Sequence, residues 1–304
     1  MERIKNFDSF YELNLKPYID ELQQQNKKAD RWGIGIIVFA FALIPVIIYG
    51  ISGSSGNFGK FLIVLMVALV VISARNYAKI SNAFETNFKE QVVKQIIDFI
   101  QPGLVYKPDV YMSSSYFRNS GLFINRYNVY DGDDMIEGVY KNVSFKCSEL
   151  NVYERRSRGT ISAVFHGLFF AAPVSRKFNS GTYIYKKDGE QYLPAFGMPG
   201  IVRLDCSNGE FENYHSVFTT NVKEASIIMN QEMMQRLTGF MSQIRRSVTM
   251  SVVAGMCYVA IPFSQDLFEP PGPYESNKEE IKEYFFTVLL ILSIINQLKL
   301  ERLQ

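Results

Sequence analysis

The chain has 304 residues, of which 47% are hydrophobic and 20% are charged, and its formal net charge is +2 at pH 7. This length allows one membrane segment and one ordinary soluble domain. So small a charge, without a basic stripe that carries aromatic residues, argues against nucleic-acid binding. The cysteines Cys147, Cys206 and Cys257 are odd in number, widely spaced and without a CxxC pair, so we expect reduced structural thiols.

Residues 1–31 predict amphipathic cytosolic helices in two pieces. Apolar residues recur at three- and four-residue steps from Ile4 to Leu22. Pro17 is expected to open the second piece, because proline suits the first turn of a helix. The segment is polar and has no small-residue cleavage site, so we expect no signal peptide and an uncleaved anchor after it.

Two apolar segments without charge, Trp32–Ile51 and Phe61–Ala74, predict a transmembrane hairpin. The first has the roughly 20 residues that a bilayer core requires. The second is short, and its flanking residues can extend it to span residues 58–75. The connecting segment Ser52–Lys60 is rich in glycine and serine, as turns are. A pair of buried core helices is the alternative interpretation.

Basic residues predict the orientation of this hairpin. They lie on both sides of it, whereas the connecting segment contains only Lys60. Since cytoplasmic flanks carry the excess of lysine and arginine, we expect both chain ends in the cytoplasm and Ser52–Gly59 outside. The flanking basic residues are Lys16, Lys27, Lys28, Arg31, Arg75, Lys79, Lys89 and Lys94.

Residues 75–102 predict an amphipathic juxtamembrane helix that ends at Pro102 and Gly103. Its apolar positions, from Tyr77 to Phe99, keep the helical period. This face can pair with the N-terminal helices as a stalk, or it can pack on the soluble domain.

Residues 103–277 predict a soluble α+β domain with a mainly antiparallel sheet of about six strands. The pattern changes to period two near Val143. A hairpin turn is expected at Glu154–Gly159, where the sequence reads ERRSRG. The expected strand regions are Val143–Cys147, Leu150–Val152, Thr160–Val174, Gly181–Lys186, Ile201–Asp205 and Tyr214–Thr219.

Helices and one further hairpin follow these strands. Asn221 is expected to cap a helix, with Glu224 at capping-box spacing, and Gln231–Ile244 predicts a second helix. Ser247–Val253 and Met256–Ile261 predict a hairpin around Ala254 and Gly255.

The segment FEPPGP, Phe268–Pro273, links this hairpin to a C-terminal apolar helix in residues 278–304, expected over Lys278–Leu303. Its stretch Tyr284–Leu298 is apolar on all sides and reaches only about 22 Å. We favour a buried core helix, with a third membrane crossing as the alternative. The predicted fold class is therefore an α+β membrane protein.

The histidines offer little catalytic signal. His166 lies in an apolar run and His215 beside a predicted strand, and neither has a metal-ligand partner at helical spacing. We expect His166 to be a packed strand residue. The acidic cluster Asp131, Asp133 and Asp134 can hold Ca²⁺ or Mg²⁺, but it lacks the bidentate glutamate of an EF-hand and is interpreted as an ordinary turn.

Two further groups of residues could take part in binding or chemistry. Arg155, Arg156 and Arg158 can contact anionic lipid headgroups if their turn faces a bilayer, although a solvated hairpin tip is the more common outcome. Cys147 and Glu149 share a strand face without a nearby histidine to activate the thiol, so we expect no cysteine nucleophile.

The sequence resembles a bacterial membrane-protein family known as domain of unknown function 3137. The resemblance rests on the two-span hairpin and on motifs that cover most of the chain. It implies no activity, cofactor or catalytic residue, and it implies a LemA-type membrane protein as a partner. The family leads us to expect a basic residue where this chain has His166, which weakens a catalytic role for it. The motifs are Tyr130–Gly138, Ser148–Leu150, Val164–Phe170, Lys177–Ile184, Tyr214–Asn230 and the stretch from Tyr258 to Pro271 (YVAIP…DLFEPP).

The leading hypothesis is a non-enzymatic, multi-pass protein of the bacterial inner membrane. Its cytosolic domain would bind a protein partner or the membrane surface, and homo-oligomers are compatible with this interpretation. No catalytic residue, cofactor or metal ligand is assigned. The alternative is a membrane-anchored enzyme that uses Asp131–Asp134 or Glu149 with a metal ion, which requires these carboxylates to converge. A transporter or channel is disfavoured, because two spans without charge in the membrane offer no pathway unless the protein oligomerises.

Overall fold

The computed structural model describes residues 7–51, 56–157, 159–174, 178–187, 200–270 and 278–300. The chain divides into two compact units. The first unit comprises Met1–Gln95 with Glu269–Lys282, and the second comprises Ile96–Phe268 with Glu283–Gln304.

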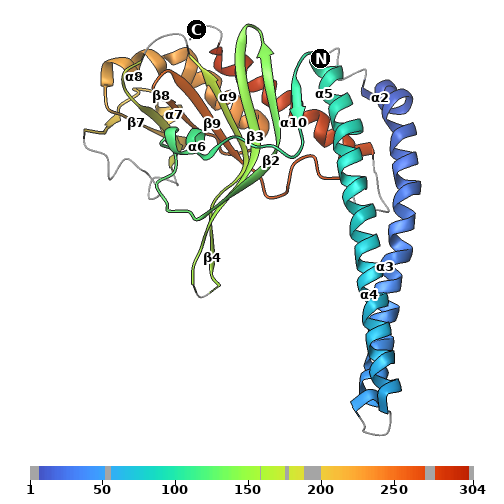
Figure 1. The fold of residues 1–304 in the computed structure, drawn as a ribbon. Helices are drawn as coiled ribbons and strands as arrows, with labels where there is room; N and C mark the ends of the chain where they lie inside the picture. The colour runs from blue at the N-terminus through green and yellow to red at the C-terminus, as the bar shows by residue number, and fades with distance from the viewer. Residues whose placement is uncertain are drawn as a thin grey trace. The chain divides into compact units, whose positions relative to one another are not determined.

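Long helices dominate the first unit, and Figure 1 shows α3 and α4 side by side. Their middle portions expose large apolar side chains, among them Phe41, Ile44 and Val64. In the most apolar 18-residue stretch of each helix, 0% and 11% of the residues are buried. Both helices are long and apolar enough to cross a membrane. The helical segments are α2 (Phe7–Phe10), α3 (Lys16–Ile51), α4 (Gly56–Phe88) and α5 (Lys94–Ile100), the last of which continues into the second unit.

Two π turns join these helical segments. The first, Tyr11–Leu15, lies between α2 and α3, and the second, Lys89–Val93, lies between α4 and α5. In the first turn the Lys16 N–H donates to the Tyr11 carbonyl. Pro17, the next residue, has no N–H and its ring crowds the preceding turn, so the wider π turn accommodates it without ending the helix. The expectation of two separate helical pieces is therefore corrected to one helix with a π turn.

Ion pairs attach the Glu269–Lys282 segment to the helices of the first unit. The Lys89 side chain is only 4% exposed, and its ammonium lies 2.7 Å from a Glu269 carboxylate oxygen. Lys278 lies 2.7 Å from Asp8 and its ammonium is 5.6 Å from the centre of the Tyr11 ring. The neighbouring lysine lowers the pKa of the Asp8 carboxyl. These pairs place charged contacts beside the first π turn and within the second.

The second unit is built on a nine-stranded antiparallel sheet with the order β1-β2-β3-β4-β9-β8-β5-β7-β6. The predicted antiparallel sheet is confirmed. It contains nine strands, where the sequence predicts six or so up to Asn221 and the two strands of the hairpin that follows. The strands are β1 (Val105–Lys107), β2 (Val129–Tyr140), β3 (Val143–Arg155), β4 (Ile161–Pro173), β5 (Thr182–Lys186), β6 (Val202–Leu204), β7 (His215–Thr219), β8 (Thr249–Val253) and β9 (Met256–Pro262).

Aromatic packing covers one face of this sheet. The buried Phe117 of the short helix α6 (Ser114–Asn119) stacks on Phe123 with 4.5 Å between ring centres and packs at 5.5 Å from Phe169 of β4. Figure 1 shows α6 in front of the sheet. Such ring pairs add stabilisation beyond their buried area, so this cluster forms one of the two cores that flank the sheet.

Helices cover the other face of the sheet. Figure 1 shows α9 and the part of α10 in this unit behind the strands. On this face Phe145 and Phe170 stack at 5.6 Å, and Asn296 of α10 donates to the Tyr140 hydroxyl of β2 at 3.2 Å. Besides α6 and the end of α5, the described helices of this unit are α7 (Gly209–Tyr214), α8 (Val222–Ile228), α9 (Gln231–Ile244) and α10 (Lys278–Leu298), of which α10 begins in the first unit.

Several predicted elements of this unit are confirmed. The β8–β9 hairpin turns at Ala254 and Gly255, both with positive φ, and α9 has the predicted bounds. The Asn221 side chain caps α8 by accepting from the N–H groups of Lys223 and Glu224. The prediction that Glu224 completes a capping box with Asn221 is wrong. The Glu224 carboxylate accepts instead from the N–H and the hydroxyl of Ser180, at 3.0 and 2.5 Å.

The interpretation of Asp131–Asp134 as a turn is wrong, since these residues lie within β2. Gly132 occupies a place where a Cβ would lie 2.2 Å from the Glu149 carbonyl oxygen of β3. Asp134 adopts a left-handed conformation, with φ at 55°, where the β2–β3 register shifts. Gly132 and Asp134 are residue types that are common in turns. Here Gly132 lets β2 lie close to β3, and Asp134 lies in a β-bulge.

Helix α10 ends at Leu298, earlier than the predicted Leu303, and residues 301–304 lie outside the described residues. It is the third helix long and apolar enough to cross a membrane, but 44% of its most apolar stretch is buried in the protein. Ile291, Ile294 and Ile295 are at most 1% exposed. This burial favours the core-helix interpretation. Parts of other predictions also lie outside the described residues, namely residues 1–6, residues 52–55, Arg158, Lys177 and residues 271–277.

Candidate functional site

The candidate site lies where β3 and β4 meet the segment that follows β9. Glu149 projects from β3 on the helix-covered face, next to Leu168 of β4. His166 of β4 lies on the same face, two residues before Leu168. Asp266 belongs to the short segment after β9. Three polar side chains that are far apart in the sequence therefore converge at one point.

The distances at this point are short. His166 Nε2 lies 3.0 Å from Glu149 Oε1 and 3.0 Å from Asp266 Oδ1. The second Glu149 oxygen, Oε2, accepts from the Leu267 N–H at 2.6 Å. The side chain of Glu149 is 4% exposed, that of His166 is 27% exposed and that of Asp266 is 64% exposed. The site therefore runs from a buried carboxylate to an open one, with the imidazole between them.

Gly167 fixes the approach of β9 to this site. Its φ is +140°, and a Cβ there would lie 2.4 Å from the Ile261 carbonyl oxygen and 2.6 Å from the Phe263 nitrogen. The His166 carbonyl accepts from the Phe263 N–H at 3.1 Å. The absence of a side chain at Gly167 thus lets the chain after β9 pass directly beside His166 and deliver Asp266.

Within the described residues, the ligand atoms of Glu149, His166 and Asp266 all lie within 4.8 Å of one another. One imidazole nitrogen and two carboxylate oxygens are a set that divalent metal ions accept. The same set can also work as a hydrogen-bonded bridge between β3, β4 and the segment after β9. The structure therefore brings Glu149 and His166 together and adds Asp266, which the sequence analysis missed.

The other predicted acidic residues are not in this cluster. Asp131 is exposed, and Asp134 is buried and accepts from the Tyr106 hydroxyl at 2.5 Å. Asp133 lies opposite Glu149 in the ladder, but the possible metal ligands grouped with Glu149 are His166 and Asp266. The enzyme hypothesis requires its carboxylates to converge at one site. Glu149 converges with His166 and Asp266, whereas Asp131, Asp133 and Asp134 do not join that group.

His215, the second histidine, is buried at the start of β7. Its ring stacks on Phe211 with 4.8 Å between centres, and its Nδ1 lies 3.3 Å from the Phe211 carbonyl oxygen. Desolvation by burial lowers the pKa of His215. The ring is therefore held neutral inside the core, as a structural residue.

This burial predicts a pH effect on stability. The unfolded chain takes up a proton at His215 near pH 6.5, whereas the folded chain does so only at lower pH. Acidification below about pH 6.5 should therefore favour unfolding, with a slope of at most about 1.4 kcal/mol per pH unit from this group. Unfolding midpoints of the purified protein at pH 5 to 8 check this. His215→Gln should show a shallower pH dependence, and an unchanged profile would contradict the assignment.

The cysteines are poor nucleophiles. Burial raises the pKa of Cys147, and it raises those of Cys206 and Cys257 to about 11 and about 12. These thiols are thus protonated near neutral pH and unreactive. The prediction that Cys147 and Glu149 share a strand face is confirmed by their two-residue spacing in β3.

The predicted turn after β3 is present. Arg156 donates its N–H to the Thr160 carbonyl and its guanidinium pairs with Glu154 at 2.9 Å. The Arg155 guanidinium lies 5.8 Å from the centre of the Tyr153 ring. The described arginines of this turn thus have local partners, and Arg158 lies outside the described residues.

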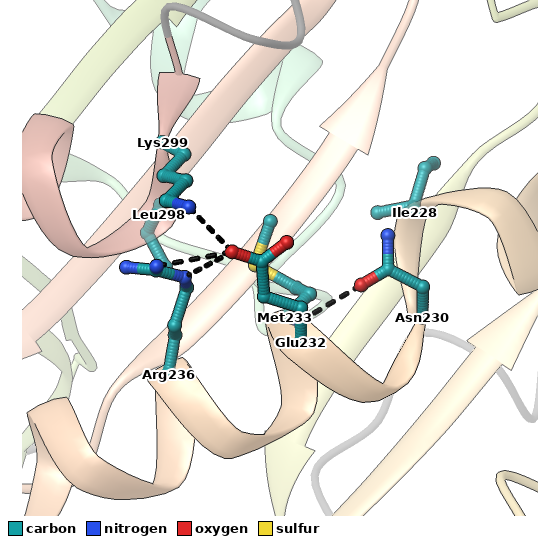
Figure 2. A pocket seen from close by; sticks show the side chains of 7 residues that line it. All are labelled: Ile228, Asn230, Glu232, Met233, Arg236, Leu298 and Lys299. Carbon is teal, nitrogen blue, oxygen red and sulfur yellow. Dashed lines mark hydrogen bonds and ion pairs between the residues drawn. The ribbon is translucent and has the colours of Figure 1, made fainter.

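A small hollow of about 60 Å³ lies between α8, α9 and the end of α10. Figure 2 shows Glu232 between two cations in this hollow, with its Oε1 at 3.0 Å from Arg236 and 2.5 Å from Lys299. These cations lower the pKa of Glu232. The three charges already pair with one another, so this hollow is interpreted as an ion-pair link between α9 and the C-terminal residues.

Comparisons with known proteins give one family and one structural neighbour. Residues 163–300 match the model of a family described as "Protein of unknown function (DUF3137)". No curated protein matches the chain. The crystal structure of the mycobacterial trehalose monomycolate transport factor A, TtfA, is similar at 12% identity and a TM-score of 0.36, over 68% of this chain and 93% of that one. A TM-score this low transfers neither fold nor function.

Proposed function

We propose, from its architecture, that the chain is a membrane-anchored, non-enzymatic binding module. Its residues 163–300 match the model of the DUF3137 family, which is described only by its unknown function. Helices α3 and α4 cross the bacterial inner membrane, and the nine-stranded unit binds a protein partner or the membrane surface on the cytoplasmic side.

One observation carries this proposal: the long apolar stretches of α3 and α4 have almost no buried residues. Leaving this much apolar surface in water is unfavourable, and a lipid environment removes the cost. The helices satisfy their own backbone hydrogen bonds, as a membrane span must. Lysine and arginine on both flanks support a cytoplasmic location for the two chain ends.

Labelling of introduced cysteines tests the topology. In a Cys206→Ser background, Lys60→Cys should react with a membrane-impermeant maleimide on intact spheroplasts. Lys28→Cys should react only after the membrane is permeabilised. The remaining cysteines, Cys147 and Cys257, are fully buried and serve as internal negative controls. Labelling of Lys28→Cys in intact spheroplasts would contradict the orientation.

Photo-crosslinking in cells tests the binding role. A photoreactive residue replaces Val202, Tyr214 or Ile227, which are exposed on the second unit. A discrete protein adduct supports a protein partner, such as a LemA-type membrane protein or a second copy of the chain, and a lipid adduct supports the membrane surface. The buried Phe170 is the control position. Absence of any specific adduct from all three exposed positions would count against a binding module.

A further inference from the structure

We propose that Glu149, His166 and Asp266 form a binding site for one divalent transition-metal ion. The site would use one imidazole nitrogen and two carboxylate oxygens, with its remaining coordination positions open to water. This inference goes beyond the proposed function, and it does not depend on membrane anchoring or on a partner.

The spacing of the ligand atoms carries the argument. Two ligands about 2.1 Å from a metal ion and at right angles to each other, as in octahedral coordination, are separated by about 3.0 Å, and the tetrahedral angle preferred by zinc separates them by about 3.4 Å. His166 Nε2 lies 3.0 Å from Glu149 Oε1 and 3.0 Å from Asp266 Oδ1. Two edges of a coordination polyhedron therefore already have the required length, and all three atoms lie within 4.8 Å of one another.

The balance of protons and charges points the same way. One imidazole nitrogen lies 3.0 Å from an oxygen of each of two carboxylates, and this nitrogen carries at most one hydrogen to share between them. Two carboxylates this close repel each other. A divalent cation bound between the three atoms would offset both negative charges and accept the nitrogen lone pair at the same time.

The surroundings also suit a metal site. The Leu267 N–H holds Glu149 Oε2 at 2.6 Å, which fixes the carboxylate and leaves Oε1 directed toward His166. Hydrogen bonds of this kind orient metal ligands in known sites. Glu149 and His166 are fixed on neighbouring strands, whereas the exposed Asp266 lies on a loop segment and can adjust to an ion. The open side gives ions and water access.

The ligand types select the class of ion. Imidazole suits zinc, iron, nickel and copper, while carboxylates also suit manganese and magnesium. Three protein ligands with open positions resemble the ligand number of catalytic rather than structural zinc sites. We therefore expect Zn²⁺ and Mn²⁺ to bind and Mg²⁺, which prefers oxygen ligands, to compete weakly.

The test uses the full chain in detergent with a Cys206→Ser background, treated with a chelator and then dialysed. Equilibrium dialysis with Zn²⁺, and electron paramagnetic resonance with Mn²⁺, should show one ion per chain at micromolar concentration. Asp266→Asn and His166→Gln should each weaken binding at least tenfold. Asp266 is mostly exposed, so its variant should keep the unfolding midpoint of the parent and separate binding from folding.

The matched controls are Asp205→Asn and His215→Gln, which change an exposed aspartate and the other histidine outside the cluster. Both should bind the ion as the parent does. X-ray absorption of the zinc form should show nitrogen and oxygen ligands, with one imidazole and no sulfur. The inference is overturned by binding without a one-to-one stoichiometry, by cluster variants that bind like the parent, or by sulfur ligation.

Discussion

Gly167→Ala is expected to lower the free energy of unfolding by about 3 kcal/mol or more, since it combines backbone strain with a steric clash. The new Cβ would lie 2.4 Å from the Ile261 carbonyl oxygen and 2.6 Å from the Phe263 nitrogen. Neither atom is the end of a flexible side chain, so β4 and β9 must separate. Chemical unfolding of the detergent-solubilised protein measures the loss.

Gly239→Ala is the matched control for this change. Gly239 lies on the exposed surface of α9, and a Cβ there would meet no atom within 4 Å. Because alanine is the better helix former, this variant should be neutral or more stable by up to about 1 kcal/mol. Equal effects of the two substitutions would show that the close β4–β9 approach is not what Gly167 provides.

Carboxylates in the middle of α3 and α4 are expected to abolish membrane integration. The four-residue variant Phe41→Asp, Ile44→Asp, Val64→Asp and Val67→Asp replaces lipid-compatible side chains with charged ones. Each replacement costs about 3 to 4 kcal/mol at the centre of a span, so each helix loses about 6 to 8 kcal/mol. This is about as much as the apolar side chains of either helix contribute to insertion. Alkaline carbonate should then extract the protein from membranes.

The control for this variant adds the same four charges outside the apolar stretches. Gln24→Asp, Gln25→Asp, Asn82→Asp and Thr86→Asp are all exposed positions of α3 and α4. This control protein should stay in the membrane pellet. Extraction of both variants would attribute the effect to net charge, and retention of the first variant would contradict the assignment of the two spans.

Local patterns in the sequence predicted the elements whose signals are local. The charge-free runs, the helical period of α9, the Asn221 cap and the β8–β9 hairpin each depend on neighbouring residues, and the structure contains all of them. For Asp131–Asp134 the sequence predicts a turn where the structure has a strand bulge, because both use the same residue types. Only the partner strand, with its Glu149 carbonyl against Gly132, distinguishes the two.

The candidate site was harder to predict from the sequence than the helices and strands. Sequence spacing does not connect Glu149 with His166, because the pairing of β3 with β4 brings them together. Asp266 is 100 residues from His166 in the sequence, and its position depends on the close approach at Gly167. The only sequence signal for it was its place in the DLFEPP motif of the family resemblance, which assigned no role to any residue.

The first π turn, Tyr11–Leu15, changes the direction in which the buried apolar side chains of the N-terminal helix point. Phe7, Tyr11, Leu15 and Ile19 are all buried and follow one another at four-residue steps. In a regular α-helix with 3.6 residues per turn, each such step rotates the stripe by about 40°, so three steps would carry it about a third of the way around the helix. The wider turn at Tyr11–Leu15 contains more residues per revolution. It cancels part of this rotation and keeps the buried residues on one side of the helix.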